Sequence, residues 1–248
     1  MRKRSLALFA LVLAGCGAQK GPDTAHVLAA KTQRCTAGEQ LRLGSVRLAY
    51  AAAAPFGAIA FDRPGGFVAA RFGSRNVNGY PTVFGVVGSV VSQNCTPRWY
   101  RVQLPRKPNG RTAFVRARAL RVETVSTRIV VDVSQRRLTL YRNAKRVLTA
   151  SVAVGSPSTP TPIGRFYVNQ RLVPADVGGP YGPGAIGISA FSNVLTGWTQ
   201  GGPVAIHGTN EPWSIGHAVS NGCIRLPNAT LTRVFRMTIA GTPVIINP

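Results

Sequence analysis

The feature that most constrains this chain is a succession of short apolar segments, which glycine and proline interrupt at short intervals. The 248 residues include 27 glycines and 18 prolines. Segments around Trp99 and Phe114 alternate apolar and polar side chains, a period typical of β-strands that bury one face. The sequence therefore predicts a mainly β protein. One short amphipathic helix is expected at residues 229–237, with Asn228 as its N-cap.

A change of pattern near residues 123–126 divides the chain into two predicted β domains. Residues 35–122 read as short strands with glycine-rich turns, typical of a small barrel or sandwich. The last 25 of them, "RWYRVQLPRKPNGRTAFVRARALRV", resemble a bacterial SH3-like domain. Residues 126–248 begin as a β-meander with a turn at Asn143-Ala144, and then pass into a long Gly/Pro-rich loop typical of a lid or substrate loop. The first domain is expected to be a wall-binding module or a spacer.

The charge balance indicates an anionic partner. Lysine and arginine number 30 against seven acidic residues, so the formal net charge is +23. Such an excess fits nucleic acid, an anionic lipid surface or an acidic polymer. The charges are scattered without long runs, and no nucleic-acid recognition motif is present. We therefore expect a diffuse basic surface and no nucleic-acid partner.

The N-terminus predicts export. Arg2, Lys3 and Arg4 precede an apolar stretch, residues 6–13, that is too short to cross a bilayer but fits a secretory signal. The following "LAGC" resembles a bacterial lipobox, which implies cleavage before Cys16 and a diacylglycerol on its sulfur. Residues 1–15 are then a signal peptide and residues 16–34 a flexible tether. The expected protein is an exported, membrane-anchored lipoprotein that faces the wall or periplasm, with ordinary secretion as the alternative.

Cysteine usage follows from that compartment. With Cys16 lipidated, Cys35, Cys95 and Cys223 remain. An oxidising environment favours one disulfide and one free thiol. We expect Cys35 and Cys95 to pair, which leaves Cys223 unpaired and either deeply buried or functional.

Cys223 has neighbours that suit thiol catalysis. His207 ends the apolar segment "PVAIH", and the carbonyl of Gly208 can orient its ring. The backbone N–H groups of Asn221, Gly222 and Cys223 could stabilise an oxyanion. Arg225 lies two residues beyond Cys223, on the same face of a strand, where it could bind a carboxylate or favour the thiolate. The alternative is that Cys223 is a small buried hydrophobe.

The stretch "IHGTNEPWSIGHAVSNGCIRLPN" resembles the signature of the L,D-transpeptidase (YkuD-like) catalytic domain. That signature is His-Gly, an interval, Ser-x-Gly-Cys-x-Arg, then an apolar residue and Asn. "IVVDVSQRRLTLY" resembles the family's first hairpin, "VGSPSTPTPIGRFYV" its Thr-Pro-x-Gly-x-Phe segment and "YGPGAIGISA" its substrate loop. The resemblance covers residues 128–247 in the family's order. It implies a β-sandwich with one short helix that carries a cysteine nucleophile and acts on peptidoglycan.

Site roles carry over from this resemblance position by position. Cys223 is implied as the nucleophile and His207 as its base, with Gly208 holding the imidazole and Gly222 contributing to the oxyanion hole. Arg225 is implied to contact the donor stem.

Three further positions are implied to bind substrate: Tyr181, Ser220 and Asn221. Asn221 stands where many members have a second histidine, so no ring contribution is expected there.

The implied reaction is 3→3 cross-linking of peptidoglycan stem peptides. The cysteine forms a thioester with release of D-alanine, and a neighbouring amine resolves it; attack by water instead would give L,D-carboxypeptidase activity. No metal or other cofactor is expected, and we expect a monomer. A papain-like protease is disfavoured because its cysteine precedes its histidine. A catalytically inactive peptidoglycan-binding wall lipoprotein stays open as the alternative.

Overall fold

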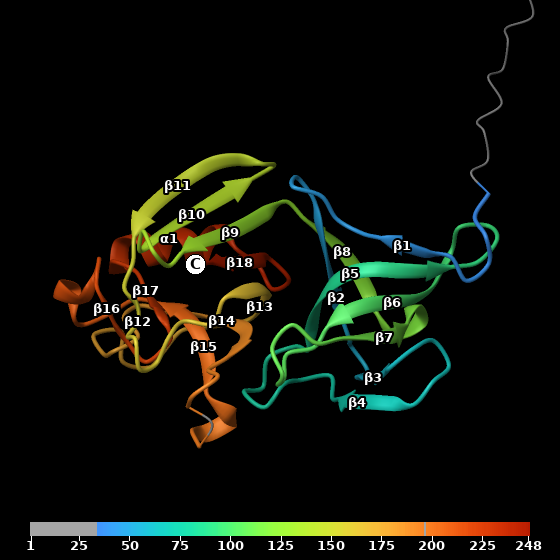
Figure 1. Ribbon diagram of the computed structural model, residues 1–248, viewed down its shortest axis with the longest axis horizontal. Coiled ribbons are helices and arrows are strands. Elements are labelled where there is room, and N and C mark those ends of the chain that lie inside the picture. Colours follow the sequence, from blue (N-terminus) through green and yellow to red (C-terminus); the bar gives the residue numbers. More distant parts are fainter. Residues whose placement is uncertain (1–33, 196) are drawn as a thin grey trace, which may run out of the picture. The chain divides into compact units, whose positions relative to one another are not determined.

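The computed structural model describes residues 34–195 and 197–248, and residues 34–248 belong to one compact unit. The predicted signal peptide, Cys16 and all but the last residue of the predicted tether lie outside the described residues. No helix in the described part of the chain is long and apolar enough to cross a membrane. The described residues are mainly β with one α-helix, which confirms the predicted class (Figure 1).

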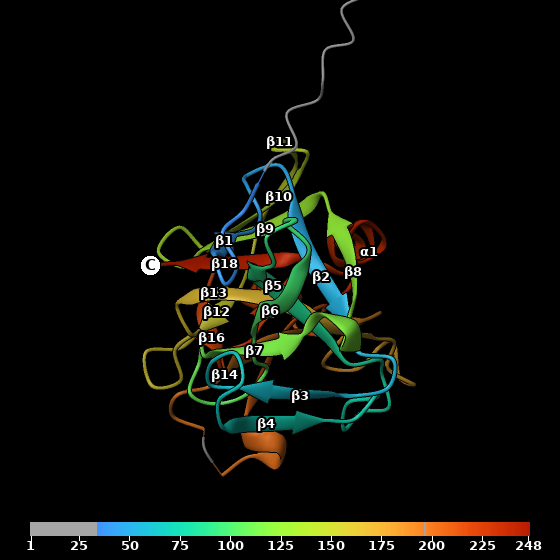
Figure 2. The same cartoon turned by 90° about the vertical axis from the view of Figure 1, so that its right-hand side faces the viewer.

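The first half of the chain forms an antiparallel sheet. Its order is β4-β3-β7-β6-β5-β2-β8, and β1 also pairs with β5 (Figure 2). The buried alanines of these segments belong to the same core cluster as Phe84, Val102 and Val115, which are fully buried. The elements are β1 (Gln40–Arg42), β2 (Ala49–Ala53), β3 (Ala58–Phe61), β4 (Val68–Phe72), β5 (Val83–Val91), β6 (Pro97–Gln103), β7 (Thr112–Arg116), the 3₁₀ turn η1 (Ala117–Ala119) and β8 (Arg121–Val125).

A disulfide joins Cys35 to Cys95, with 5.1 Å between their Cα atoms. It ties the segment before β1 to the turn between β5 and β6. β8 ends at Val125 and the next strand begins at Thr127, so the sheets change at Ser126. The SH3-like assignment and the domain limits 35–122 and 126–248 stay predictions.

The second half forms a β-sandwich. Its strand order is β11-β10-β9-β18-β13-β14-β15-β17, and a separate parallel pair joins β12 to β16. The elements are β9 (Thr127–Asp132), β10 (Arg137–Arg142), β11 (Lys145–Ser151), β12 (Val154–Gly155), β13 (Gly164–Leu172), β14 (Ala185–Phe191), η2 (Thr199–Gly201), β15 (Pro203–His207), η3 (Pro212–Ser214), β16 (Ala218–Ser220), β17 (Ile224–Arg225), α1 (Asn228–Met237) and β18 (Pro243–Asn247).

The long strand β13 makes the corner of this sandwich. Its first part, residues 164–167, pairs with β18, and residues 168–172 pair with β14 across a register irregularity. The two layers enclose aliphatic side chains that are almost fully buried, including Ile129, Leu140, Ile186 and Ile206. This core holds β15 and β17 in place. The predicted turn is confirmed too, because Asn143 and Ala144 both have positive φ between β10 and β11.

The helix α1 begins one residue earlier than expected. Asn228 is its first residue and Pro227 its N-cap, with no side-chain capping bond, so the prediction of Asn228 as N-cap is wrong. Leu231 and Val234, three residues apart on one face, are fully buried against the sandwich. The side chain of Asn228 is engaged elsewhere, in the site described next.

Candidate active site

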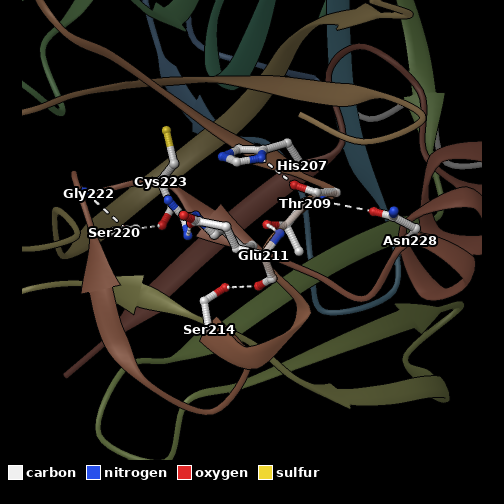
Figure 3. Close-up of polar contacts among 10 residues, drawn as sticks. His207, Thr209, Glu211, Ser214, Ser220, Gly222, Cys223 and Asn228 are labelled. Carbon is white, nitrogen blue, oxygen red and sulfur yellow. Dashed lines mark hydrogen bonds and ion pairs between the residues drawn. The ribbon is translucent and has the colours of Figure 1, made fainter. Parts of the chain in front are cut away.

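The predicted pair of Cys223 and His207 meets at two parallel strands. β15 pairs with β17 so that Ile206 faces Ile224 and His207 faces Arg225. His207 and Arg225 are partners in this register, so they project from one face, and Cys223 directly precedes β17, two residues before Arg225. The backbone N–H of Ala205 donates to Cys223 Sγ at 3.5 Å. Figure 3 shows the His207 ring beside the Cys223 side chain, although no hydrogen bond joins the two among the described residues.

His207 is held in one orientation and in its neutral form. Its side chain is almost fully buried, at 4% exposure, and Nδ1 lies 2.6 Å from the carbonyl oxygen of Gly208. A carbonyl only accepts, so Nδ1–H donates and Nε2 is left to take a proton. Burial lowers the His207 pKa to about 4, although the Gly208 and Pro180 carbonyls act in the opposite direction. The Tyr181 ring meets the imidazole edge-on at 5.0 Å and is itself half exposed.

The Cys223 thiol is free and half-buried. Burial raises its pKa above the usual 9.0, while the Ala205 N–H and the charge of Arg225 act to lower it. A thiol with a raised pKa and an imidazole with a lowered one are both neutral at pH 7. The resting site is therefore a neutral pair, and the thiol has to lose its proton as it reacts.

The loop before Cys223 is tied down by hydroxyl groups. Ser220 Oγ donates to the Cys223 carbonyl at 2.6 Å and accepts from the Gly222 N–H at 3.2 Å. Ser220 is buried, so its hydroxyl is engaged within the fold and is not presented to a substrate. The Gly222 N–H is already bonded to Ser220. Of the N–H groups of residues 222 and 223, that of Cys223 is therefore the one without an acceptor among the described residues. Gly222 has φ +102°, a conformation that glycine adopts without strain.

Two threonines support this loop from the other side. Thr159 Oγ1 donates to the Ser220 carbonyl at 2.9 Å, and Thr161 Oγ1 donates to the Gly222 carbonyl at 3.0 Å. Thr161 Oγ1 also accepts from the Gly155 N–H at 2.8 Å. The Thr-Pro-x-Gly-x-Phe segment singled out in the sequence thus supplies a brace for the cysteine loop.

Asn228 fixes the turn that orients His207. Its Oδ1 accepts from the Thr209 N–H at 2.7 Å (Figure 3). A Cβ added to Gly208 or Gly182 would lie 2.4 Å from that oxygen, so the turn closes only around glycine. The sequence marks Gly208 and Asn228 as motif positions, and the structure adds that they contact each other across 20 residues of chain.

Arg225 is not free. Its Nη1 donates to the carboxylate of Glu211, a residue that the sequence interpretation missed. Glu211 lies in the interval between His207 and Cys223 and is one of only seven acidic residues, which is the signal that could have identified it. Asn221, predicted to bind substrate, is exposed beside the loop. Within residues 34–195 and 197–248, no cluster of three or more His, Cys, Asp or Glu side chains is arranged to hold a metal ion.

Comparison with known proteins finds a family whose members are similar to the second half of this chain. The L,D-transpeptidase catalytic domain model (YkuD) matches residues 126–246. A Bacillus licheniformis protein assigned as the L,D-transpeptidase YkuD is 36% identical over 126 residues, 51% of this chain and 68% of the relative. Its Bacillus subtilis counterpart is 36% identical over 124 residues, 50% and 68% respectively.

A solved structure gives a weaker match. In the crystal structure of an Enterococcus faecium L,D-transpeptidase mutant, the matched residues are 30% identical in sequence to this chain, and the TM-score is 0.39. The match covers 49% of this chain and 49% of that one, so this chain spans about half the length of the solved relative.

Proposed function

This chain belongs to the YkuD L,D-transpeptidase family, and we propose that it forms 3→3 peptidoglycan cross-links through a thioester on Cys223. The observation that carries the proposal is the pairing of a free thiol with a buried, neutral imidazole on one face of β15 and β17. His207 has one ring nitrogen committed to Gly208 and the other available as a base.

The acylation step uses these groups in turn. His207 Nε2 takes the thiol proton as Cys223 Sγ attacks the carbonyl at the L-centre of the stem's diamino acid, next to its terminal D-alanine. The Cys223 N–H donates to the developing oxyanion. The imidazolium then gives its proton to the D-alanine nitrogen, the C–N bond breaks, and D-alanine leaves. The product is a thioester between Cys223 and the shortened stem.

The second step resolves that thioester. His207 removes a proton from the side-chain amine of a neighbouring stem, which attacks the thioester carbonyl and releases the thiol. Water in place of the amine gives L,D-carboxypeptidase activity as a side reaction. We assign Tyr181 and Asn221 to substrate contact, because both are exposed beside the reacting pair. Ser220 is assigned to holding the loop.

The experiment is mass spectrometry of the chain after exposure to a carbapenem and, separately, to tetrapeptide muropeptides. We expect an acyl adduct on Cys223 and new 3→3 dimers. Both should be lost in Cys223→Ala and His207→Gln. The matched control is His217→Gln, which removes an exposed histidine outside the site. Folded protein that forms neither adduct nor dimer would instead support an inactive peptidoglycan-binding lipoprotein.

We also propose that the protein is exported and anchored through a lipid on Cys16, so that it faces the wall or periplasm. The lipobox-like "LAGC" and the basic N-terminus support this. Metabolic labelling with an alkyne fatty acid tests it: label should appear in the wild type and be absent in Cys16→Ser.

A further inference from the structure

The pair formed by Glu211 and Arg225 is unusual in this chain. The chain has 30 basic residues and seven acidic ones. Two ion pairs are recorded among the described residues, and the other joins Asp62 to Arg63 at 4.0 Å on the surface. The Arg225 side chain is only 20% exposed, against 44% for Glu211. The Glu211 carboxylate, one of few in the chain, therefore pairs with the mostly buried guanidinium of Arg225, two residues from Cys223.

Glu211 is delivered from a fixed turn. Its N–H donates to Thr209 Oγ1 at 2.9 Å, and its carbonyl accepts from the Ser214 hydroxyl at 2.6 Å and the Ser214 N–H at 3.0 Å. Thr209 is in turn held by Asn228. Figure 3 shows this chain of contacts running from Asn228 to the Glu211 side chain. The carboxylate is thus anchored to the same turn that orients His207.

Arg225 is anchored at its backbone and only partly satisfied at its tip. Its N–H and carbonyl both bond to Ala153, each at 3.0 Å. Glu211 takes Nη1, whereas Nε is buried without a hydrogen-bond partner. A guanidinium is planar, so fixing Nη1 also fixes the direction of its other donors. Nη2 has no hydrogen-bond partner among the described residues and is not buried, so it is the donor left for a ligand carboxylate.

We infer that Glu211 is a positioning residue, which holds the Arg225 guanidinium so that its remaining N–H groups bind the carboxylate of the donor stem's terminal D-alanine. This inference rests on the proposed function. Arg225 lies two residues from Cys223 on the same strand face, about 7 Å along the chain. The D-alanine carboxylate lies one residue beyond the carbonyl that Cys223 attacks, so the Arg225 guanidinium can reach it. Arg-carboxylate pairing is directional, so the fixed orientation sets specificity for a free C-terminus.

The test compares D-alanine release from a tetrapeptide with release of D-alaninamide from the same peptide amidated at its C-terminus. For the acid, Glu211→Ala should raise KM about tenfold, the effect of one charge-assisted hydrogen bond, with kcat within about threefold. KM for the amide should not change. Glu211→Gln should recover part of the loss, because its amide oxygen can still accept from Nη1.

A double-mutant cycle identifies the route of the effect. In an Arg225→Gln background, Glu211→Ala should add no further loss. Asp62→Asn is the matched control, since it removes the acid of the other ion pair, and it should leave both substrates unaffected. Equal losses on acid and amide, or additive losses with Arg225→Gln, would overturn the inference.

The outcome is separable from failure of the proposed function. A wild type that forms no thioester defeats the proposed function. A wild type that forms it, with Glu211→Ala and Glu211→Gln both unchanged on the acid, defeats only this inference. Calorimetric titration of the tetrapeptide into Cys223→Ala and Cys223→Ala/Glu211→Gln gives a readout without turnover, and the second variant should bind more weakly.

Discussion

Replacing Thr161 by valine removes one hydroxyl that two buried backbone groups share. Thr161 is 3% exposed, and its Oγ1 donates to the Gly222 carbonyl while it accepts from the Gly155 N–H. Valine keeps the shape of the side chain but can make neither bond. Both backbone groups then stay buried without a partner, and the loop that carries Cys223 loses its brace.

The expected destabilisation follows from those two groups. A buried polar group left without a partner loses about 1–3 kcal/mol, so two of them predict a loss of about 3 kcal/mol with partial relaxation. For a folded unit of this size, each kcal/mol lowers Tm by about 2–4 °C. Thr161→Val should therefore melt about 6–12 °C below the wild type. Carbapenem acylation of Cys223 should also slow.

The assay combines thermal unfolding with the acylation rate at 25 °C. Thr161→Ser keeps the hydroxyl and loses one methyl group, so it should lose only about 1 kcal/mol and acylate normally. Thr238→Val is the control: Thr238 is buried and its hydroxyl donates to the Val234 carbonyl at 2.9 Å. That carbonyl keeps the Thr238 N–H at 3.0 Å, so this variant should lose little stability and acylate at the wild-type rate. A Thr161→Val protein with unchanged Tm, or a Thr161→Ser protein equally impaired, would refute the reasoning.

Three further predictions follow from single contacts. Burial lowers the His207 pKa to about 4 in the folded protein, so as pH falls below about 6.5 the unfolded state binds a proton that the folded state does not. Urea unfolding should therefore show a loss of about 3 kcal/mol of stability by pH 4 from this residue. His207→Gln should not show that loss. Replacing Cys35 and Cys95 by alanine should destabilise by about 4 kcal/mol in calorimetry, without changing Cys223 acylation at 25 °C. Asn228→Ala should slow acylation several-fold, and an unchanged rate would contradict its role.

Local sequence patterns were sufficient for the class of fold and for a prediction of where the chemistry takes place. Alternation with period two and glycine/proline punctuation act within a few residues, so the strand-rich character and the Asn143-Ala144 turn could be predicted. The His-Gly and Ser-x-Gly-Cys-x-Arg spacing gave the family and the order of the site residues. These features depend on residues that are close together in the chain, so they can be recognised without knowledge of contacts between distant residues.

Contacts between distant residues were decided by the tertiary structure alone. The pattern does not say that β13 divides between two layers, or that β15 and β17 pair in parallel. It also does not show what two side chains bond to: Ser220 Oγ accepts from the Gly222 N–H, and Asn228 accepts from the Thr209 N–H and is not the N-cap of its helix. The ion pair between Arg225 and Glu211 could not be predicted for the same reason. A side chain's hydrogen-bond partner depends on which strands lie side by side, and that is fixed by burial of the whole core, not by the residues next to it in the chain.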